Sequence, residues 1–467
     1  MAFRPHMTVL EQRDALAKGE TSSVALVSAT LDAIDAAEPA LGAYKVIRRE
    51  EALAEAADAD AKRERGEGGA LLGIPVAIKD ETDLEGHPTA FGCRGDWPVA
   101  REDSAMVKRI RGAGGVIVGK THSPELGQWP FTEGYEFAVR NPWSLEHSPG
   151  GSSGGASATV ASGAIAASFG ADGAGSIRIP AAWTNLVGIK PQRGRVSAYP
   201  HTDPFYGLTV YGPLSRTVAD AAHLLDVVTG NHPDDVHQPT APTEPFAAAA
   251  TRSPKRLRIA LSFKVPFSLV RATVDPRVEA STRRLAEVLA SLGHEVVEAD
   301  PNYGLIGTSF LPRSMVGLND WVKRSPDPSV LDPRSRGNAR LGAFLRGPGL
   351  KYALGSSGHF ERKVGAIFDQ VDVVLAPTTA QTPLTVGSAV PGTSNHKTDQ
   401  VIIGACPMTW PWNVLGWPSV NVPAGFIDGL PVGAQLMGPA CSEALLISLA
   451  AELEAEEKWF THTAPTL

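Results

Sequence analysis

Two short clusters of glycine and serine could place hydroxyl groups on a tightly bent backbone. Residues 150–155 read Gly-Gly-Ser-Ser-Gly-Gly, and residues 172–176 read Asp-Gly-Ala-Gly-Ser. Between Ser148 and Ser176 there are eight glycines and seven serines in 29 residues. Because glycine adopts dihedral angles that other residues avoid, such a turn can aim successive backbone N–H groups at one point. The second cluster could therefore hold a negatively charged oxygen beside the Ser176 hydroxyl.

A flexible linker would have a similar composition, but the apolar residues argue against one. Val160, Ile165 and Phe169 lie between the clusters, and the sequence Ile-Arg-Ile-Pro follows Ser176. The small residues from 156 to about 167 predict a helix that packs closely against its neighbours. We therefore expect a folded core to hold both clusters.

Predicted helices and strands alternate around these clusters, which is typical of an α/β fold. The first 65 residues are predicted to be helical, and residues 71–78 form a short apolar run that ends at Lys79. This run predicts a buried strand, although Pro75 limits its hydrogen bonding. Further strands are expected at 115–119, 257–261, 295–297, 371–377, 420–424 and 432–436, with helices at 104–111 and 276–292.

The chain is expected to form one large amidase-sized α/β domain over residues 1–467, with four parts. Residues 231–255 are rich in proline and alanine and predict a surface linker. The other parts are N-terminal helices at 1–65, a core with the glycine motifs at 66–230, and a second part of the sheet at 256–467 with a variable helical cap near 303–365.

Charge and hydropathy exclude several classes of protein. The 43 Lys and Arg residues against 50 Asp and Glu give a net charge of −7, and no basic run appears, so nucleic-acid binding is not expected. No stretch of about 18 apolar residues or signal peptide is apparent, which predicts a cytoplasmic protein without a membrane contact. The 3 cysteines lie far apart and the 12 histidines are scattered, so we expect no metal and no cofactor.

Two other motifs fit their patterns poorly. Residues 114–121 match the P-loop, but Val-Ile-Val in the middle favours a strand over a phosphate-binding turn. Residues 150–154 match the Gly-x-Ser-x-Gly nucleophile elbow, which would make Ser152 the nucleophile of an α/β-hydrolase-type esterase. The residues before it do not form the apolar strand that this motif requires, so the esterase stays a second alternative.

The glycine–serine motifs resemble the amidase signature family of serine hydrolases. The resemblance depends on residues 150–155 and on Asp-Gly-Ala-Gly-Ser-Ile-Arg-Ile-Pro at 172–180. Four further stretches agree: Gly-Ile-Pro-Val-Ala-Ile-Lys-Asp at 73–80, Arg-Asn-Pro-Trp at 140–143, Gly-Ile-Lys-Pro at 188–191, and Gly-Leu-Pro-Val-Gly-Ala-Gln-Leu at 429–436. The resemblance covers nearly the whole chain and implies a single large domain in which helices cover both faces of a mixed central sheet.

The resemblance also implies a Ser-Ser-Lys catalytic triad that hydrolyses an amide through an acyl-enzyme. By its place in the motifs, Ser176 is the nucleophile, Ser152 is the bridging serine that follows a cis peptide bond, and Lys79 is the base. The oxyanion hole would consist of backbone N–H groups from Gly173, Ala174, Gly175 and Ser176.

An ammonium group cannot act as a base, so Lys79 must be neutral when it accepts a proton. An exposed lysine has a pKa of about 10.4, and burial can lower it by several units. We therefore expect Lys79 to be buried near the two serines, with no carboxylate beside it. Asp80 should point the other way because successive strand residues face opposite sides.

This sequence departs from the family pattern at two places. Gly173 and Ala174 stand where Thr-Gly is common, so the dihedral angles at Ala174 must suit a residue with a Cβ. Residues 183–185, Trp-Thr-Asn, stand where Phe-Cys-Gly is common. Neither change removes a catalytic group.

The substrate is expected to be a small-molecule amide, and the resemblance is compatible with an aryl-acylamidase, an oligoamide hydrolase or a carbamate hydrolase. Some of the aromatic residues Trp129, Phe131, Tyr135 and Phe137 could line an acyl pocket, or they could be ordinary core residues. Trp129, Tyr135, Phe137 and Ser153 are the candidates for substrate binding.

The main alternative is the glutaminase (A) subunit of a tRNA-dependent amidotransferase. That subunit usually carries glutamine where this chain has Ile179, and region 303–365 lacks an obvious polar glutamine site. The family resemblance is also compatible with a homodimer.

Overall fold

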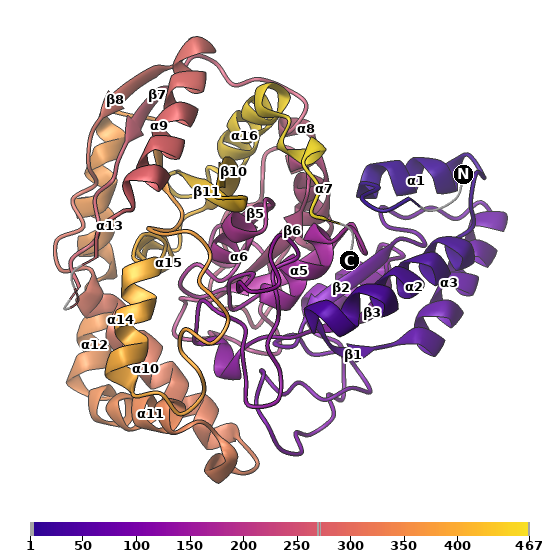
Figure 1. The fold of residues 1–467 in the computed structure, drawn as a ribbon, viewed down its shortest axis with the longest axis horizontal. Helices are drawn as coiled ribbons and strands as arrows, with labels where there is room; N and C mark the ends of the chain where they lie inside the picture. Colours follow the sequence, from indigo (N-terminus) through magenta and orange to yellow (C-terminus); the bar gives the residue numbers. More distant parts are fainter. Residues whose placement is uncertain (1–3, 269, 271, 466–467) are drawn as a thin grey trace.

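Strands from both halves of the chain form one mixed β-sheet in the computed structural model, which describes residues 4–268, 270 and 272–465 (Figure 1). In these residues the sheet has 11 strands in the order β1-β3-β2-β4-β6-β5-β10-β11-β9-β7-β8. The strands are β1 (Tyr44–Ile47), β2 (Pro75–Lys79), β3 (Val116–Thr121), β4 (Ser168–Asp172), β5 (Val187–Lys190), β6 (Val210–Ser215), β7 (Arg258–Leu261), β8 (Glu295–Glu298), β9 (Val373–Pro377), β10 (Ser419–Ile427) and β11 (Leu430–Met437).

The sheet is parallel near both ends and antiparallel in the middle. Strand β2 pairs in parallel with β3 and with β4, and β7 pairs in parallel with β8 and β9. The strands from β4 to β9 across the centre pair in antiparallel fashion. Every residue of β2, β3 and β4 is buried, as expected for strands with both faces covered.

Helices cover both faces because neighbouring strand residues point to opposite sides. Ile78 packs in one core with α1, α4, α7, α8, α9 and α16, whereas Ala77 packs in a second core with α2, α3, α5 and α6. Val374 packs in a third core that includes residues of α13 and α15. Figure 1 shows α1–α3 at one end of the molecule and α10–α13 at the other.

The helices, including the short α8 and α15, have the following bounds: α1 (Val9–Ala17), α2 (Ser23–Leu41), α3 (Arg49–Glu64), α4 (Ala105–Gly112), α5 (Gly154–Ala161), α6 (Arg178–Trp183), α7 (Val218–Val228), α8 (Phe246–Ala249), α9 (Pro276–Ser291), α10 (Gly307–Arg324), α11 (Pro333–Leu345), α12 (Pro348–Gly355), α13 (Ser357–Gly365), α14 (Asn395–Ala405), α15 (Pro411–Leu415) and α16 (Glu443–Glu457). Short 3-10 helices occur at Glu125–Gly127, Pro328–Val330, Ala366–Asp369 and Trp459–Thr461.

The prediction of an α/β fold with helices on both faces of one sheet is confirmed, but three details differ. The first 65 residues are not all helical, because β1 pairs with β3 at the edge of the sheet. Helix α5 ends at Ala161, earlier than predicted. The proline-rich stretch 231–255 is not only a surface linker, because it contains α8, whose Phe246 is buried in the core.

Several local predictions are confirmed by the structure. Residues 116–121 form strand β3, as the valines inside the P-loop match indicated. The late strand pair turns at Asp428 and Gly429, which have φ angles of 52° and 78°. Region 303–365 is largely helical, with α10–α13.

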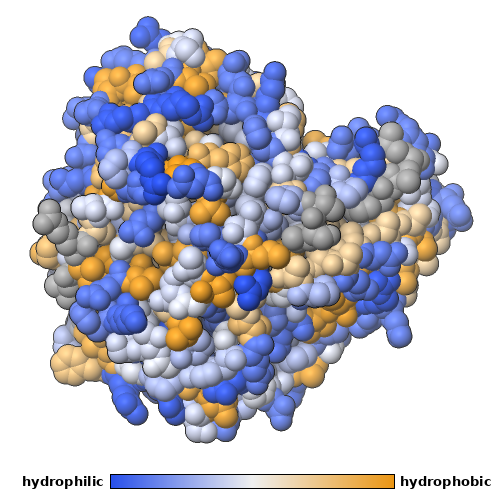
Figure 2. All heavy atoms as spheres, in the orientation of Figure 1, coloured by the Kyte–Doolittle hydropathy of each residue, from blue (hydrophilic) through white to orange (hydrophobic). Residues whose placement is uncertain are grey.

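Polar and apolar residues are mixed across the surface that Figure 2 shows. Among the described residues, no helix combines the length and apolar character needed to cross a membrane.

Asn185 links the strand region after α6 to the end of the chain. It has a φ of 62°, and its Nδ2 donates to the carbonyl oxygens of Trp459 and His462 at 3.1 and 3.4 Å. Asparagine tolerates this left-handed conformation better than most residues, which explains how it can stand where glycine is common.

We predict that Asn185→Ala lowers the free energy of unfolding by about 1–3 kcal/mol, because it removes buried hydrogen bonds and leaves a strained backbone. Asn185→Gly should fall between alanine and the natural residue, since glycine relieves the strain but makes no side-chain bond. Urea unfolding of the three proteins measures the difference. Equal stability of the alanine variant and the natural protein would refute this account.

Candidate active site

The two candidate catalytic segments lie at the same edge of the sheet. Lys79 is the last residue of β2, and Asp172 is the last residue of β4. Because β2 and β4 are parallel neighbours, their carboxyl ends meet at one edge. The turn with Ser176 follows β4 directly and leads into α6. Such edges are common places for ligands in α/β sheets.

Ser152 lies between these segments, just before helix α5. It is 2% exposed, and the Gly151–Ser152 peptide bond is cis, as the family resemblance implies. Lys79 Nζ donates a hydrogen bond to Ser152 Oγ at 2.6 Å. The next residue, Ser153, donates its backbone N–H to the carbonyl oxygen of Ser176 at 3.1 Å. The structure thus brings the three predicted triad segments together.

Lys79 is buried as expected, with 1% exposure. Burial lowers its pKa, because an ammonium group loses its hydration there, although the carboxylate of Glu81 opposes this shift. The expectation that no carboxylate lies beside Lys79 is wrong: Glu81 Oε1 is 2.9 Å from Lys79 Nζ.

The reason lies in the chain path after β2. Strand alternation stops at Lys79, and a turn follows in which the N–H of Thr82 donates to the carbonyl oxygen of Lys79 at 3.1 Å. This turn folds Glu81 back toward Lys79. Asp80 does point away as predicted, and its Oδ1 is 3.0 Å from Lys120 Nζ.

Asp172 shapes the turn that carries Ser176. Its carboxylate accepts hydrogen bonds from the backbone N–H groups of Gly175 at 2.8 Å and of Ile177 at 3.2 Å. Arg178 completes the arrangement with a fully buried ion pair at 3.0 Å. Burial alone would raise the pKa of Asp172, but the Arg178 guanidinium outweighs it and holds that pKa well below its usual range.

The predicted oxyanion hole needs one correction. Gly175 was expected to offer its N–H to the oxyanion, but that N–H donates to Asp172. Among the described hydrogen bonds, none uses the N–H of Gly173, Ala174 or Ser176. Ala174 is not among the described non-glycine residues with positive φ, so its backbone suits a residue with a Cβ.

Gly175 itself cannot be replaced by a larger residue. Its φ is 122°, and a Cβ there would lie 2.3 Å from Thr409 Oγ1. Thr409 Oγ1 also donates to the carbonyl oxygen of Ala174 at 2.5 Å. The turn is therefore held from both sides, by Asp172 and by Thr409.

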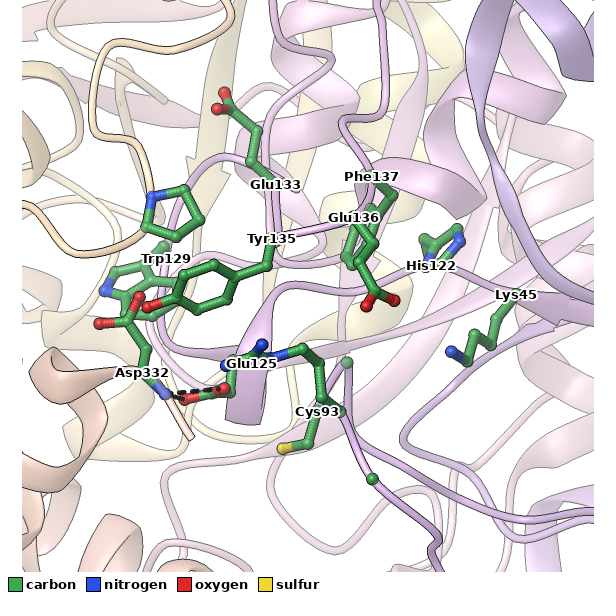
Figure 3. Close-up of a pocket in the computed structure, with 15 residues that line it drawn as sticks. Lys45, Cys93, His122, Glu125, Trp129, Glu133, Tyr135, Glu136, Phe137 and Asp332 are labelled. Carbon is green, nitrogen blue, oxygen red and sulfur yellow. Dashed lines mark hydrogen bonds between the residues drawn. The ribbon is translucent and has the colours of Figure 1, made fainter. Parts of the chain in front are cut away.

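Three of the candidate substrate residues line one pocket, which has a volume of about 150 Å³ (Figure 3). Trp129 and Tyr135 lie on one side in this view, and Phe137 lies beside His122 on the other. The fourth candidate, Ser153, is fully buried, and its hydroxyl donates to the carbonyl oxygen of Ala171 at 3.2 Å. Its hydroxyl thus joins α5 to β4.

Charged side chains hold the aromatic residues of this pocket. The Arg334 guanidinium lies over the Trp129 ring at 4.1 Å, and Arg94 lies over Tyr135 at 4.0 Å. His122 stacks on Phe137 with ring centroids 3.9 Å apart. Burial lowers the pKa of His122 to about 4, so the imidazole is neutral at pH 7. The carboxylates of Glu125, Glu133, Glu136 and Asp332 also line the pocket.

The pocket lies next to the serine pair. A Cβ at Gly151 would be 2.5 Å from the carbonyl oxygen of Trp129 and 2.7 Å from the backbone nitrogen of Phe131. The backbone that presents the aromatic residues therefore packs directly on the segment that presents Ser152.

Known proteins match this chain over nearly its whole length. The amidase family model matches residues 25–447. The chain belongs to the amidase signature family. A relative in Mycobacterium tuberculosis (strain ATCC 25618 / H37Rv), named "Putative amidase AmiA2", is 52% identical over 96% of this amidase and 92% of its own length.

Solved structures of amide hydrolases have the same fold. A 6-aminohexanoate cyclic dimer hydrolase matches with a TM-score of 0.92 and 27% identity over 99% of both chains. A bacterial aryl acylamidase of the amidase signature family matches with a TM-score of 0.86 and 26% identity over 97% of both chains. This amidase is accordingly an enzyme that hydrolyses the C–N bond of amides.

The alternatives are not favoured. An esterase with Ser152 in a nucleophile elbow would need a strand directly before it, but residues 145–153 form turns and bends. The Ser152 hydroxyl is also buried against Lys79. The glutaminase-subunit alternative loses support because relatives and neighbours include amidases that match more closely over the full chain.

The sequence analysis missed Glu81, Arg178, Arg94 and Asp332 as site residues. Glu81 and Arg178 stand inside the recognised motifs, so two charged residues in buried segments were an available signal. Arg94 and Asp332 come from segments far apart in the chain and carry no such signal.

We predict that Asp172→Asn lowers the free energy of unfolding by about 3–5 kcal/mol, because it leaves the buried Arg178 without its carboxylate. The kcat/KM should fall by roughly 10²–10³-fold, since the turn that offers N–H groups to the oxyanion loses its anchor. Urea unfolding and amide hydrolysis measure the two effects. The exposed Asp58→Asn serves as the control, and Asp172→Asn with unchanged stability and kcat/KM would contradict the role of Asp172.

Proposed function

We propose that this amidase forms an acyl-enzyme on Ser176, with Ser152 and Lys79 as the proton relay. The observation that supports this most is the buried Lys79 amine, which is 2.6 Å from Ser152 Oγ at the edge of the sheet where Ser176 lies. A buried lysine with a lowered pKa can serve as a base near neutral pH.

In the proposed reaction, neutral Lys79 takes the proton of Ser152 while Ser152 takes the proton of Ser176. The Ser176 oxygen forms a bond to the amide carbon, and the carbonyl oxygen becomes an oxyanion. The C–N bond then breaks, and the proton returns from Lys79 through Ser152 to the leaving nitrogen. Water attacks the acyl-enzyme by the same relay, which releases the acid and restores Ser176.

The oxyanion is proposed to bind the free N–H groups of the turn after β4. Gly173, Ala174 and Ser176 are the donors, because the N–H of Gly175 is already bonded to Asp172. Such donors contribute most when they are fixed before the reaction, and the hydrogen bonds to Asp172 and from Thr409 fix this turn.

For the substrate, we propose amides with an aromatic or medium-sized acyl group. The pocket of about 150 Å³ is lined by Trp129, Tyr135 and Phe137, and a cavity of this size accommodates one benzene ring. The aryl acylamidase among the structural neighbours gives independent support for this class. The charged side chains at the pocket add polar contacts for a substituent on the ring. Self-association as a homodimer stays a prediction.

The nucleophile is tested with a fluorophosphonate probe. We predict that the probe labels Ser176, that Ser176→Ala abolishes labelling and amide hydrolysis, and that Lys79→Ala slows both by several orders of magnitude. Ser162→Ala, a half-buried serine at the end of α5, is the control and should be labelled normally. Labelling of Ser152, found by peptide mass spectrometry, would show that the nucleophile assignment is wrong.

The acyl pocket is tested with a series of amides from acetyl to benzoyl and hexanoyl. We predict that Phe137→Ala and Tyr135→Ala lower kcat/KM for benzoyl amides by roughly 10–100-fold more than for acetyl amides, since each removes apolar contact area. Tyr352→Ala, an exposed tyrosine on α12, is the control. An unchanged preference across the series in both pocket variants would refute the acyl-pocket proposal.

A further inference from the structure

The amine of Lys79 lies between two oxygen atoms of different character. Ser152 Oγ is 2.6 Å away and Glu81 Oε1 is 2.9 Å away. Lys79 has 1% of its side chain exposed and Glu81 has 11%. No other described donor makes a hydrogen bond to Glu81 Oε1, so Lys79 is the group that compensates its charge.

We propose that Glu81 is a positioning residue that acts through Lys79: its carboxylate sets the pH at which Lys79 becomes neutral and can accept a proton. This inference rests on the proposed role of Lys79 as the base. An ionised carboxylate at this distance stabilises the ammonium form, and the attraction is strong because little water screens a buried pair. Lys79 and Glu81 therefore titrate as one unit.

The surroundings of the pair keep solvent away. Gly127 packs so closely that a Cβ there would lie 2.4 Å from Glu81 Oε1 and 3.3 Å from Ser152 Oγ. Its φ of 63° belongs to the region that favours glycine. On the remaining side, Glu81 borders a cavity of about 10 Å³ that is lined by Leu126, Thr209 and Tyr211 among others, which is room for about one water molecule.

The other charged groups near Lys79 have partners of their own. Asp80 pairs with Lys120 at 3.0 Å, and Asp172 pairs with Arg178 at 3.0 Å. Tyr211 faces Glu81 across the small cavity, and burial raises the pKa of its hydroxyl well above the usual range, so it stays neutral. Glu81 is thus the carboxylate near Lys79 that depends on Lys79.

Glu81 opposes the effect of burial. Burial favours the neutral amine, and the carboxylate favours the ammonium, so their balance places the acid limb of the pH–rate profile. Removing the negative charge leaves burial unopposed. The pKa of Lys79 should then fall, and the base form should persist to lower pH.

The test is the pH dependence of kcat/KM in Glu81→Gln, with Glu81→Met as a second variant that also removes the charge. Both should move the acid limb to lower pH by one unit or more, which corresponds to about tenfold in the relative rate below the limb for each unit. The rate of fluorophosphonate labelling should shift in parallel. Glu81→Asp, which keeps a charge in this loop, should return the limb toward that of the natural enzyme.

Asp83→Asn is the matched control, because Asp83 lies on the same loop with 18% of its side chain exposed and faces His201 at 3.9 Å. Its acid limb should not move. A limb that stays in place or moves to higher pH in both Glu81→Gln and Glu81→Met would overturn the proposal. Failure of the triad itself would look different, because Lys79→Ala would then keep its labelling rate.

Discussion

The burial of one lysine amine is the constraint on which this active site depends. Lys79 is enclosed at the end of β2, against Ser152 on one side and Glu81 on the other. Taking an ammonium group out of water is costly, and this cost favours the neutral amine that base catalysis needs. The sheet makes this burial possible, because β2 lies between the parallel strands β3 and β4 with helices on both faces.

A second buried charge performs the opposite task one strand away. Asp172 stays ionised because Arg178 compensates it, and its carboxylate ties down the turn that leads to Ser176. The two carboxylates near the site thus differ in role. Asp172 has a permanent cation and organises backbone, whereas Glu81 shares its only cation with the proposed proton relay.

The sequence was sufficient to predict the fold class, the alternation of strands and the segments that meet at the sheet edge. Lys79, Ser152 and Ser176 stand in motifs with fixed spacing, so the strand and turn around each could be inferred. Glu81 was misjudged because strand periodicity was extended past Lys79, where the chain turns. The use of the Gly175 N–H by Asp172 depends on the geometry of one turn, which residue types do not reveal.

The pocket shows a different limit of sequence reasoning. Trp129, Tyr135 and Phe137 were apparent as aromatic residues before the serine pair, but Arg94 and Arg334 reach them from other parts of the chain. Contacts between residues more than 200 positions apart, such as Glu125 with Asp332, have no local pattern. Their effect is to fix the aromatic rings beside the proposed nucleophile.

The central claim is that acyl transfer takes place on Ser176 with Lys79 as the base. The most direct measurement is intact-protein and peptide mass spectrometry after rapid acid quenching during turnover of a substrate that deacylates slowly. The account predicts an added acyl mass on the peptide that contains Ser176, and a much slower appearance of this mass in Lys79→Ala. An acyl group on Ser152, or acylation at an unchanged rate without Lys79, would contradict it.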